Sequence, residues 1–155
     1  PQFVDPAKGA ERHGLDRIGT SADLVPFASD ADFVVCTATV NTESRGMINS
    51  AVFRAMKRTG FVVNVSRGPV IDEGDLIEAL RAGTIAGAGL DVFAEEPIRA
   101  GHPLLAMEQV LATPHVAGVT SQAYEGICRV VVENITAVKE GRAPNYCVNL
   151  HAVAR

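Results

Sequence analysis

Short apolar runs alternate along the 155-residue chain with amphipathic stretches, and this alternation restricts the possible fold more than any other feature. Four runs are almost entirely apolar: Phe33–Cys36, Phe61–Val65, Ile85–Val92 and Val110–Ala112. Runs of this length without a polar side are typical of parallel strands that are covered on both faces. Because helical patterns lie between them, the chain is expected to form βαβ units in an α/β fold, a doubly wound parallel sheet with helices on both faces.

Helix signals fill the stretches between these runs. Acids in the first turn, a basic residue in the last and a following Gly83 predict a helix from Asp72 to Arg81. Apolar residues at near-helical spacing predict a longer helix over Ser121–Glu140, which ends at Gly141. Two shorter helices are expected, one near residues 21–27 and one over residues 50–56.

Composition narrows the possible partners. A net charge of −4 and the lack of a Lys/Arg cluster leave no basic patch for nucleic acid. Cys36, Cys128 and Cys147 are far apart and form no C-x-x-C pair, which favours reduced thiols over a disulfide framework or a zinc site. No apolar stretch approaches the roughly 18 residues of a membrane helix, and no signal peptide opens the chain. We therefore expect a globular, cytoplasmic protein without a metal or membrane partner.

Chemistry-bearing residues follow three of the predicted strands. In open parallel sheets, ligands bind beyond the carboxyl ends of the strands. Arg67 follows the second run, Asp91 and Glu96 follow the third, and His115 follows the fourth. Each has an ordinary explanation when taken alone, because a solvated arginine or acid and a structural histidine are common.

Together, the arginine, the acid and the histidine suit one chemistry. A 2-oxo acid has a carboxylate, which Arg67 could hold, and a carbonyl, which it could polarise. His115 could give or take the proton on the carbonyl oxygen, and a neighbouring glutamate from the Glu95-Glu96 pair would favour the imidazolium and orient the ring. Since protein side chains carry no hydride, a redox cofactor is required.

Three linked motifs resemble the signatures of D-isomer-specific 2-hydroxyacid dehydrogenases. They are Asn-Val-Ser-Arg-Gly-Pro-Val-Ile-Asp at 64–72, Gly-Leu-Asp-Val-Phe with Glu-Glu-Pro and His-Pro-Leu between 89 and 104, and Thr-Pro-His-Val-Ala-Gly at 113–118. Their order and spacing agree as well, over nearly the whole chain. The resemblance implies a Rossmann-like domain and an NAD-dependent oxidoreductase acting on a small D-2-hydroxy acid or 2-oxo acid. It assigns the catalytic set to Arg67, Glu96 and His115.

The resemblance also implies cofactor contacts. Asp5 would accept hydrogen bonds from the adenosine ribose, and its charge would favour NAD over NADP by repelling a 2′-phosphate. Asp91 would accept from the nicotinamide carboxamide. The other implied cofactor residues are Thr37, Ala38, Thr39, Val65, Ser66, Arg67, His115 and Gly118. Relatives usually carry a proline where this chain has Thr39, so side-chain roles in that segment are open.

The family's G-x-G-x-x-G phosphate loop is not found in this sequence. Gly87-Ala88-Gly89 is a partial look-alike that lies inside a predicted strand, where we expect its glycines to allow close packing. We therefore expect a fragment, with a partial dinucleotide-binding domain at 1–140 and a segment at 141–155 that returns toward a substrate domain. Alone, it is expected to bind NAD weakly or not at all and to be inactive. The full-length protein is expected to be a homodimer, as the resemblance implies.

Two other functions remain open at this point. An NAD-sensing binding protein, such as a corepressor, could keep the same arginine, glutamate and histidine. An inert remnant domain would explain the missing glycine loop. The substrate is open too, among hydroxypyruvate, glyoxylate, phosphoglycerate, lactate and formate, although a Glu96–His115 pair argues mildly against formate, which has no carbonyl to protonate.

Overall fold

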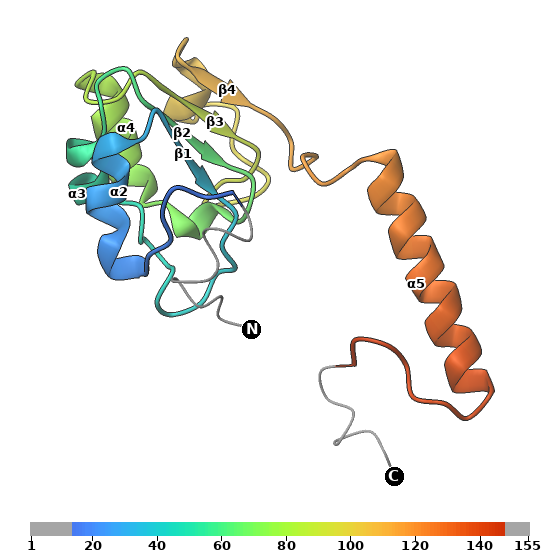
Figure 1. Cartoon of the computed structure of the whole chain (residues 1–155). Coiled ribbons are helices and arrows are strands. Elements are labelled where there is room, and N and C mark those ends of the chain that lie inside the picture. The colour runs from blue at the N-terminus through green and yellow to red at the C-terminus, as the bar shows by residue number, and fades with distance from the viewer. Residues whose placement is uncertain (1–13, 148–155) are drawn as a thin grey trace. The chain divides into compact units, whose positions relative to one another are not determined.

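A computed structural model of the chain describes residues 14–147, which fall into two compact units that divide between His115 and Val116. The first unit contains a sheet with its helices, and the second contains one long helix (Figure 1).

Four parallel strands form the sheet of the first unit. They are β1 (Phe33–Cys36), β2 (Phe61–Asn64), β3 (Gly87–Leu90) and β4 (Val110–Ala112), and they lie side by side in that order. The predicted parallel sheet is therefore confirmed, with β1 and β4 at their expected bounds. Strand β3 is shorter than the predicted run, although the chain stays paired with β2 on either side of it. The amide of Ala86 donates to the carbonyl of Gly60, just before β2, and the amide of Asp91 donates to that of Asn64, the last residue of β2.

The helices of this unit lie close to their predicted positions, although the one expected near residues 21–27 continues to Asp30 and the one expected over residues 50–56 ends at Ala55. The helical segments of this unit are η1 (Ser21–Asp23), α2 (Leu24–Asp30), α3 (Ser50–Ala55), η2 (Gly68–Val70), α4 (Glu73–Arg81) and η3 (Pro103–Ala106). The side chain of Asn49 caps α3 by accepting from the amide of Ala51, and that of Asp72 caps α4 by accepting from the amide of Asp75. Gly83 follows α4 with a φ of +62°, which is the predicted stop.

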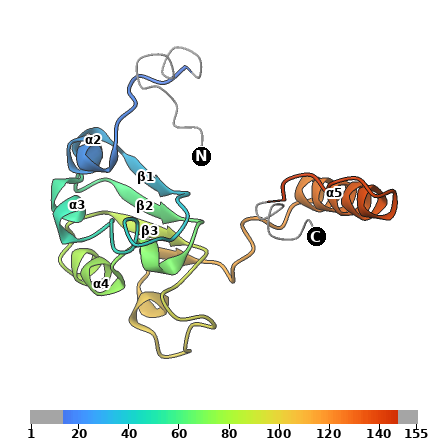
Figure 2. The same ribbon diagram turned by 90° about the horizontal axis from the view of Figure 1, so that it is seen from below.

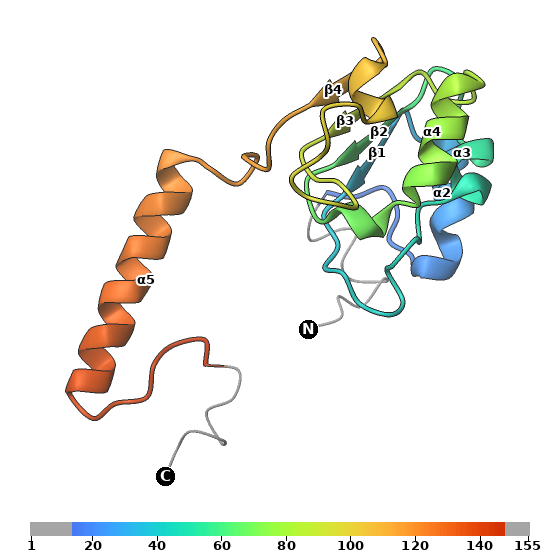
Figure 3. The same ribbon diagram turned by 180° about the vertical axis from the view of Figure 1, so that it is seen from behind.

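Helices α2, α3 and α4 lie together on one face of the sheet (Figures 2 and 3). Because successive strands are added in one direction and parallel crossovers are right-handed, the crossover helices α3 and α4 arrive on the same side. The core between these layers consists of buried side chains: Ala28, Cys36, Val52, Phe53, Val62, Leu76, Leu80, Ile85, Ala88 and Leu90. On the opposite face, Phe33 and Leu111 are 63% and 72% exposed. The helices predicted for both faces thus cover one face within the described part of this unit.

Gly87 packs as tightly as its place in a strand predicted. A Cβ on Gly87 would lie 2.5 Å from the carbonyl oxygen of Gln109 and 2.9 Å from the ring of Phe61. Gly89 has more room, because a Cβ there would meet Val63 at an ordinary 3.7 Å. The close-packing explanation therefore applies to Gly87 and not to Gly89.

The second unit contains α5 (Ser121–Lys139), which begins where the side chain of Thr120 accepts from the amide of Ala123. Gly141, with a φ of +71°, follows its end as predicted. The spaced apolar residues of the predicted stripe, among them Ile127 and Ile135, are exposed within this unit. None of the helices within residues 14–147 has the length and apolar character needed to cross a bilayer.

Candidate active site

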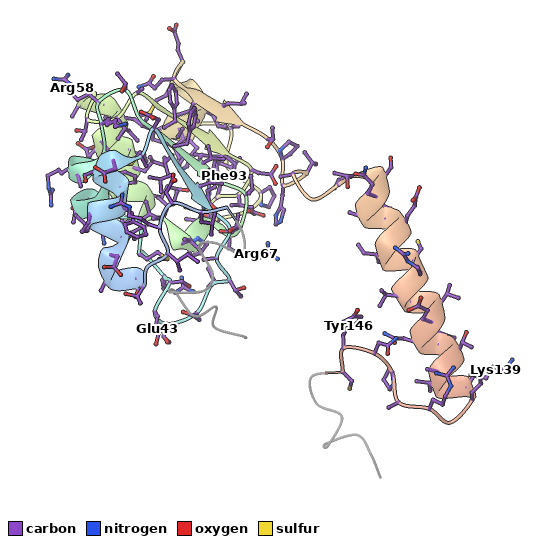
Figure 4. All side chains as sticks on the ribbon, viewed as in Figure 1. Glu43, Arg58, Arg67, Phe93, Lys139 and Tyr146 are labelled. Atoms are coloured by element: carbon purple, nitrogen blue, oxygen red, sulfur yellow. The ribbon has the colours of Figure 1, made fainter. Side chains whose placement is uncertain are left out.

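The turns after β2, β3 and β4 bring the predicted catalytic residues to the carboxyl ends of the strands. Arg67 lies just beyond β2, Glu96 lies in the loop after β3, and His115 follows β4. Figure 4 labels Arg67 together with Phe93, which belongs to the Glu96 loop, on the side where the strands end. The parallel topology explains this grouping, since all four strands end at the same edge of the sheet.

His115 and Glu96 form a direct hydrogen bond. Nδ1 of His115 and Oε2 of Glu96 are 2.8 Å apart, so the contact that the resemblance implied is present in the structure. The other carboxylate oxygen of Glu96 accepts from the backbone amide of Phe93 at 3.0 Å. An ionised carboxylate can only accept, and Nδ1 of His115 is therefore the donor. The nitrogen Nε2 of the ring is left to meet a ligand.

The surroundings of Glu96 keep it ionised. The hydrogen bond from His115 is the largest cause that lowers the pKa of Glu96, followed by the hydrogen bond from the Phe93 amide. The positive charge of Arg67 lowers this pKa as well, by a smaller amount. Arg67, Glu96 and His115 are thus one electrostatic group, although Arg67 makes its own hydrogen bond elsewhere.

We expect Glu96 to titrate below the ordinary range of a glutamate. Because its pKa is lowered in the folded protein, the stability that its hydrogen bonds provide is present at neutral pH and is lost only as the pH falls through that lowered value. Carbon-13 NMR titration of the Glu96 carboxyl measures this midpoint. Replacing His115 with alanine removes the largest cause, so the midpoint should move upward, and a midpoint that stays unchanged in that variant would contradict this account.

A buried amide organises the turn that carries Arg67. Asn64 is the last residue of β2 and is 1% exposed. Its Oδ1 accepts from the backbone amide and the hydroxyl of Ser66, at 3.0 and 2.9 Å, and its Nδ2 donates to the carbonyl of Arg67 at 3.0 Å. Sequence reasoning missed this residue, although an asparagine at the end of an apolar strand needs hydrogen-bonding partners when it is buried.

The Arg67 turn and the Glu96 loop touch each other through their backbones. A Cβ on Gly68 would lie 1.8 Å from the carbonyl oxygen of Phe93, so only glycine fits there. Nη1 of Arg67 donates to the carbonyl of Ser66 at 2.6 Å, which folds the side chain back over its own turn. The close approach of Gly68 to Phe93 fixes the spacing between the turn that carries Arg67 and the loop that carries Glu96.

His115 has an unusual backbone conformation. Its φ is +56°, in the left-handed region that costs a non-glycine residue about 1–3 kcal/mol. Its amide donates to the carbonyl of Asp91 at 2.9 Å, and the hydroxyl of Thr113 donates to the Asp91 carboxylate at 2.5 Å. The preceding Pro114 restrains its own φ and the residue before it, so the proline alone does not set this conformation.

Two cavities open at the carboxyl ends of the strands, and most of the predicted cofactor residues line them. One, of about 550 Å³, is lined by Asp91, Phe93, Glu96, Pro97, Ile98, Leu105, Ala112, Thr113, Pro114 and His115. The other, of about 260 Å³, is lined by Thr37, Ala38, Thr39, Val65, Ser66 and Arg67. The larger is of the size that small-molecule sites usually have. Asp5 lies outside the described residues, and Gly118 belongs to the second unit.

A family model described as the NAD binding domain of D-isomer specific 2-hydroxyacid dehydrogenases matches residues 3–117. A glyoxylate/hydroxypyruvate reductase B of Serratia proteamaculans is 39% identical over 127 residues, which are 82% of this chain and 39% of that protein.

Solved structures of D-isomer specific 2-hydroxyacid dehydrogenases are similar to this chain as well. A D-isomer specific 2-hydroxyacid dehydrogenase from Xanthobacter autotrophicus Py2, in complex with NADPH and MES, is 36% identical with a TM-score of 0.76, and the match covers 90% of this chain and 45% of that one. The NAD complexed form of such an enzyme from Lactobacillus delbrueckii ssp. bulgaricus is 29% identical with a TM-score of 0.74, over 81% and 42%. The chain thus spans less than half the length of each of these relatives.

Proposed function

Because this chain belongs to the D-isomer specific 2-hydroxyacid dehydrogenase family, we propose that the whole protein transfers a hydride between NAD(H) and a small 2-oxo or D-2-hydroxy acid. The observation that carries the proposal is the hydrogen-bonded pair of His115 and Glu96 beside the charge of Arg67, at the ligand-binding edge of the sheet. The similarity to a glyoxylate/hydroxypyruvate reductase supports small 2-oxo acids as the substrate class.

Each residue of the group has a role in the proposed reaction. Arg67 binds the substrate carboxylate with its planar guanidinium and draws electron density from the adjacent carbonyl. In the reduction, Nε2 of His115 gives its proton to the carbonyl oxygen, and in the oxidation it takes the proton back. Glu96 accepts from Nδ1 of His115, which keeps the ring oriented. The hydride that reaches the carbon of the same carbonyl in the reduction, or leaves it in the oxidation, would be supplied or taken up by a nicotinamide nucleotide held at these residues.

The residues around the two cavities fit a nicotinamide nucleotide. Asp91 is 4% exposed and lines the larger cavity, where its carboxylate, an acceptor, suits the amide hydrogens of a carboxamide. The cavity lined by residues 37–39 and 65–67 supports a path for the nucleotide across the ends of β1 and β2. We propose that residues 37–39 contact the nucleotide through their backbone. Gly118, which belongs to the second unit, is a further proposed contact of the nucleotide.

Asp5 is proposed to select NADH over NADPH. Its carboxylate would lie against a 2′-phosphate, and like charges in contact repel strongly. In the whole protein, Asp5→Ser should lower the ratio of kcat/KM for NADH to that for NADPH by about tenfold or more. Asp16→Ser, a change to an acid outside the proposed site, should leave the ratio unaltered. A wild type that prefers NADPH, which is the nucleotide bound by the Xanthobacter relative, would overturn this assignment.

The cytoplasm is the proposed location, and a homodimer is the proposed assembly. The wide spacing of Cys36, Cys128 and Cys147 supports a reducing compartment. The homodimer rests on the family resemblance, and light scattering of the purified whole protein tests it.

A panel of 2-oxo acids tests the proposed function. Glyoxylate, hydroxypyruvate and pyruvate are each mixed with the whole protein and with NADH or NADPH, and the loss of reduced nucleotide is followed. Turnover of at least one acid supports the proposal. Tight nucleotide binding without turnover would instead favour an NAD-sensing protein, and neither binding nor turnover would favour an inert domain.

A further inference from the structure

We propose that Glu73 is a positioning residue for this site, because its carboxylate fastens both ends of the loop that carries Glu96. The inference rests on the proposed function and adds a residue that is not among those assigned above. Glu73 is the first residue of α4, in the helical layer that covers the sheet, and its carboxylate contacts Ala94 and His102 and not the catalytic residues.

The loop has little burial of its own to hold it. Phe93 at its start is 7% exposed and Leu104 beyond its end is 1% exposed. Between them, residues 94–101 are exposed except for the half-buried Ile98. A segment with so few buried apolar contacts needs other contacts if it is to hold a side chain in one place.

Glu73 supplies a contact at each end. Its Oε2 accepts from the backbone amide of Ala94 at 3.0 Å, and its Oε1 lies 3.1 Å from Nε2 of His102. The side chains of Glu73 and His102 are each only 22% exposed, so solvent competes for these bonds less than at a surface pair. One carboxylate therefore joins α4 to both ends of the loop.

The hydrogen-bond pattern of His102 makes it a donor to Glu73. Its Nδ1 accepts from the backbone amide of Leu104 at 3.4 Å and so caps η3. A ring whose Nδ1 accepts carries its hydrogen on Nε2, the atom that faces Glu73. The ring of His102 therefore links Glu73 to the start of η3.

Ala94 and His102, which Glu73 contacts, lie next to residues that contact Glu96 or line its cavity. Ala94 follows Phe93, whose amide donates to Oε1 of Glu96 and whose carbonyl packs against Gly68. Leu105 of η3 lines the same cavity as His115. Fixing Ala94 and His102 therefore fixes the span from which Glu96 reaches the imidazole.

The other two acids at the start of α4, Asp72 and Asp75, make different hydrogen bonds, so the contact with the Glu96 loop is specific to Glu73. Asp72 caps the helix by accepting from the amide of Asp75, and Asp75 accepts from the amide of Ser50 at 2.7 Å. An acid in the first turn is favoured by the helix dipole wherever its side chain points. Within residues 14–147, Glu73 is the one of these three acids that contacts the Glu96 loop, through Ala94 and His102.

A double-mutant cycle in the whole protein tests the inference. Glu73→Ala should lower kcat by at least about tenfold in the wild type, because a small displacement of a positioned group is costly. If Glu73 acts through Glu96, the same change in a Glu96→Gln background should lower kcat by less than about twofold. Glu73→Gln has one acceptor oxygen where the carboxylate has two, and its NH2 group would face one of the two donors, so this variant should fall between the wild type and the alanine variant. Glu78→Ala, on the same helix but paired with Arg81 at the surface, is the matched control.

Amide hydrogen exchange gives a readout that does not depend on turnover. In Glu73→Ala, the peptide covering residues 93–105 should exchange faster, while the peptides of β1 and β2 keep their wild-type rates. An equal loss of kcat in both backgrounds, or unchanged exchange in the loop, would overturn the inference. A wild type that turns over no 2-oxo acid would instead overturn the proposed function, and the exchange result would still report on the loop.

Discussion

Replacing His115 with glutamine should lower kcat for the reduction of 2-oxo acids by about 10²–10⁴, the contribution of a well-placed general acid. Glutamine has a similar reach and can hydrogen-bond to a carbonyl oxygen, but it cannot give up a proton at neutral pH. Nucleotide binding should change much less than kcat, because glutamine keeps a polar side chain at the implied cofactor contact of residue 115 and the predicted ribose contact at Asp5 is unaltered. Initial rates with saturating NADH and substrate measure the change.

The kinetic parameter that changes in the His115→Gln variant decides the role of His115. A fall in kcat with little change in the nucleotide Kd is the expected result. If kcat were retained and KM alone rose, His115 would be a binding residue and another group would have to supply the proton. Because residue 115 has a left-handed backbone, the substitution could also destabilise the fold. The thermal unfolding of the variant is therefore measured beside its kinetics, so that a folding defect is recognised.

The second large effect is expected at Arg67. Arg67→Gln should lower kcat/KM for 2-oxo acids by about 10² or more, since truncating one partner of a hydrogen-bonded charge pair costs about 2–5 kcal/mol. Arg67→Lys keeps the charge but loses the planar fork that binds a carboxylate with two parallel bonds, and it should recover only part of the loss. Steady-state kinetics of the whole protein measure both variants.

Arg58→Lys is the matched control for these variants. Arg58 is exposed and lies away from Arg67, as the labels of Figure 4 indicate, so the same chemical change there should leave kcat/KM unaltered. Equal activity of Arg67→Lys and the wild type would contradict a role for the guanidinium geometry. Equal activity of Arg67→Gln and the wild type would remove Arg67 from the site altogether.

The strands could be predicted because their signal is local. The bounds of β1 and β4 follow from apolar runs that end at polar or turn residues, and α4 follows from its acids, its arginine and Gly83. The grouping of Arg67, Glu96 and His115 needed one further step, the rule that parallel strands end at the same edge. Local pattern and topology therefore predicted that an arginine, an acid and a histidine would meet at one edge, and the family resemblance was needed to select Glu96 among the acids.

Other features depend on contacts between distant segments, which no local pattern encodes. Gly68 must be glycine because Phe93, 25 positions later, has its carbonyl oxygen where a Cβ would be. The left-handed backbone of His115 is held by the carbonyl of Asp91 on the neighbouring strand end. Glu73 looked like an ordinary first-turn acid until its bonds to Ala94 and His102 were seen.

The layers that cover the sheet depend on information that the strands do not carry. Runs that are apolar on both sides do indicate burial, but the sequence does not say what will cover them. In the first unit, α2, α3 and α4 cover one face, and side chains such as Phe33, Val35 and Leu111 remain exposed on the other within the described residues. An apolar strand therefore indicates that its faces are covered without identifying the segment that covers them.

The product of one reaction tests the central proposal most directly. The whole protein is incubated with hydroxypyruvate and NADH, and the glycerate formed is resolved by chiral chromatography, with His115→Gln assayed in parallel. If Arg67 and His115 serve a D-isomer specific reduction, the wild type yields D-glycerate in step with the loss of NADH, and the variant yields almost none. L-Glycerate, or D-glycerate formed equally fast by the variant, would contradict it.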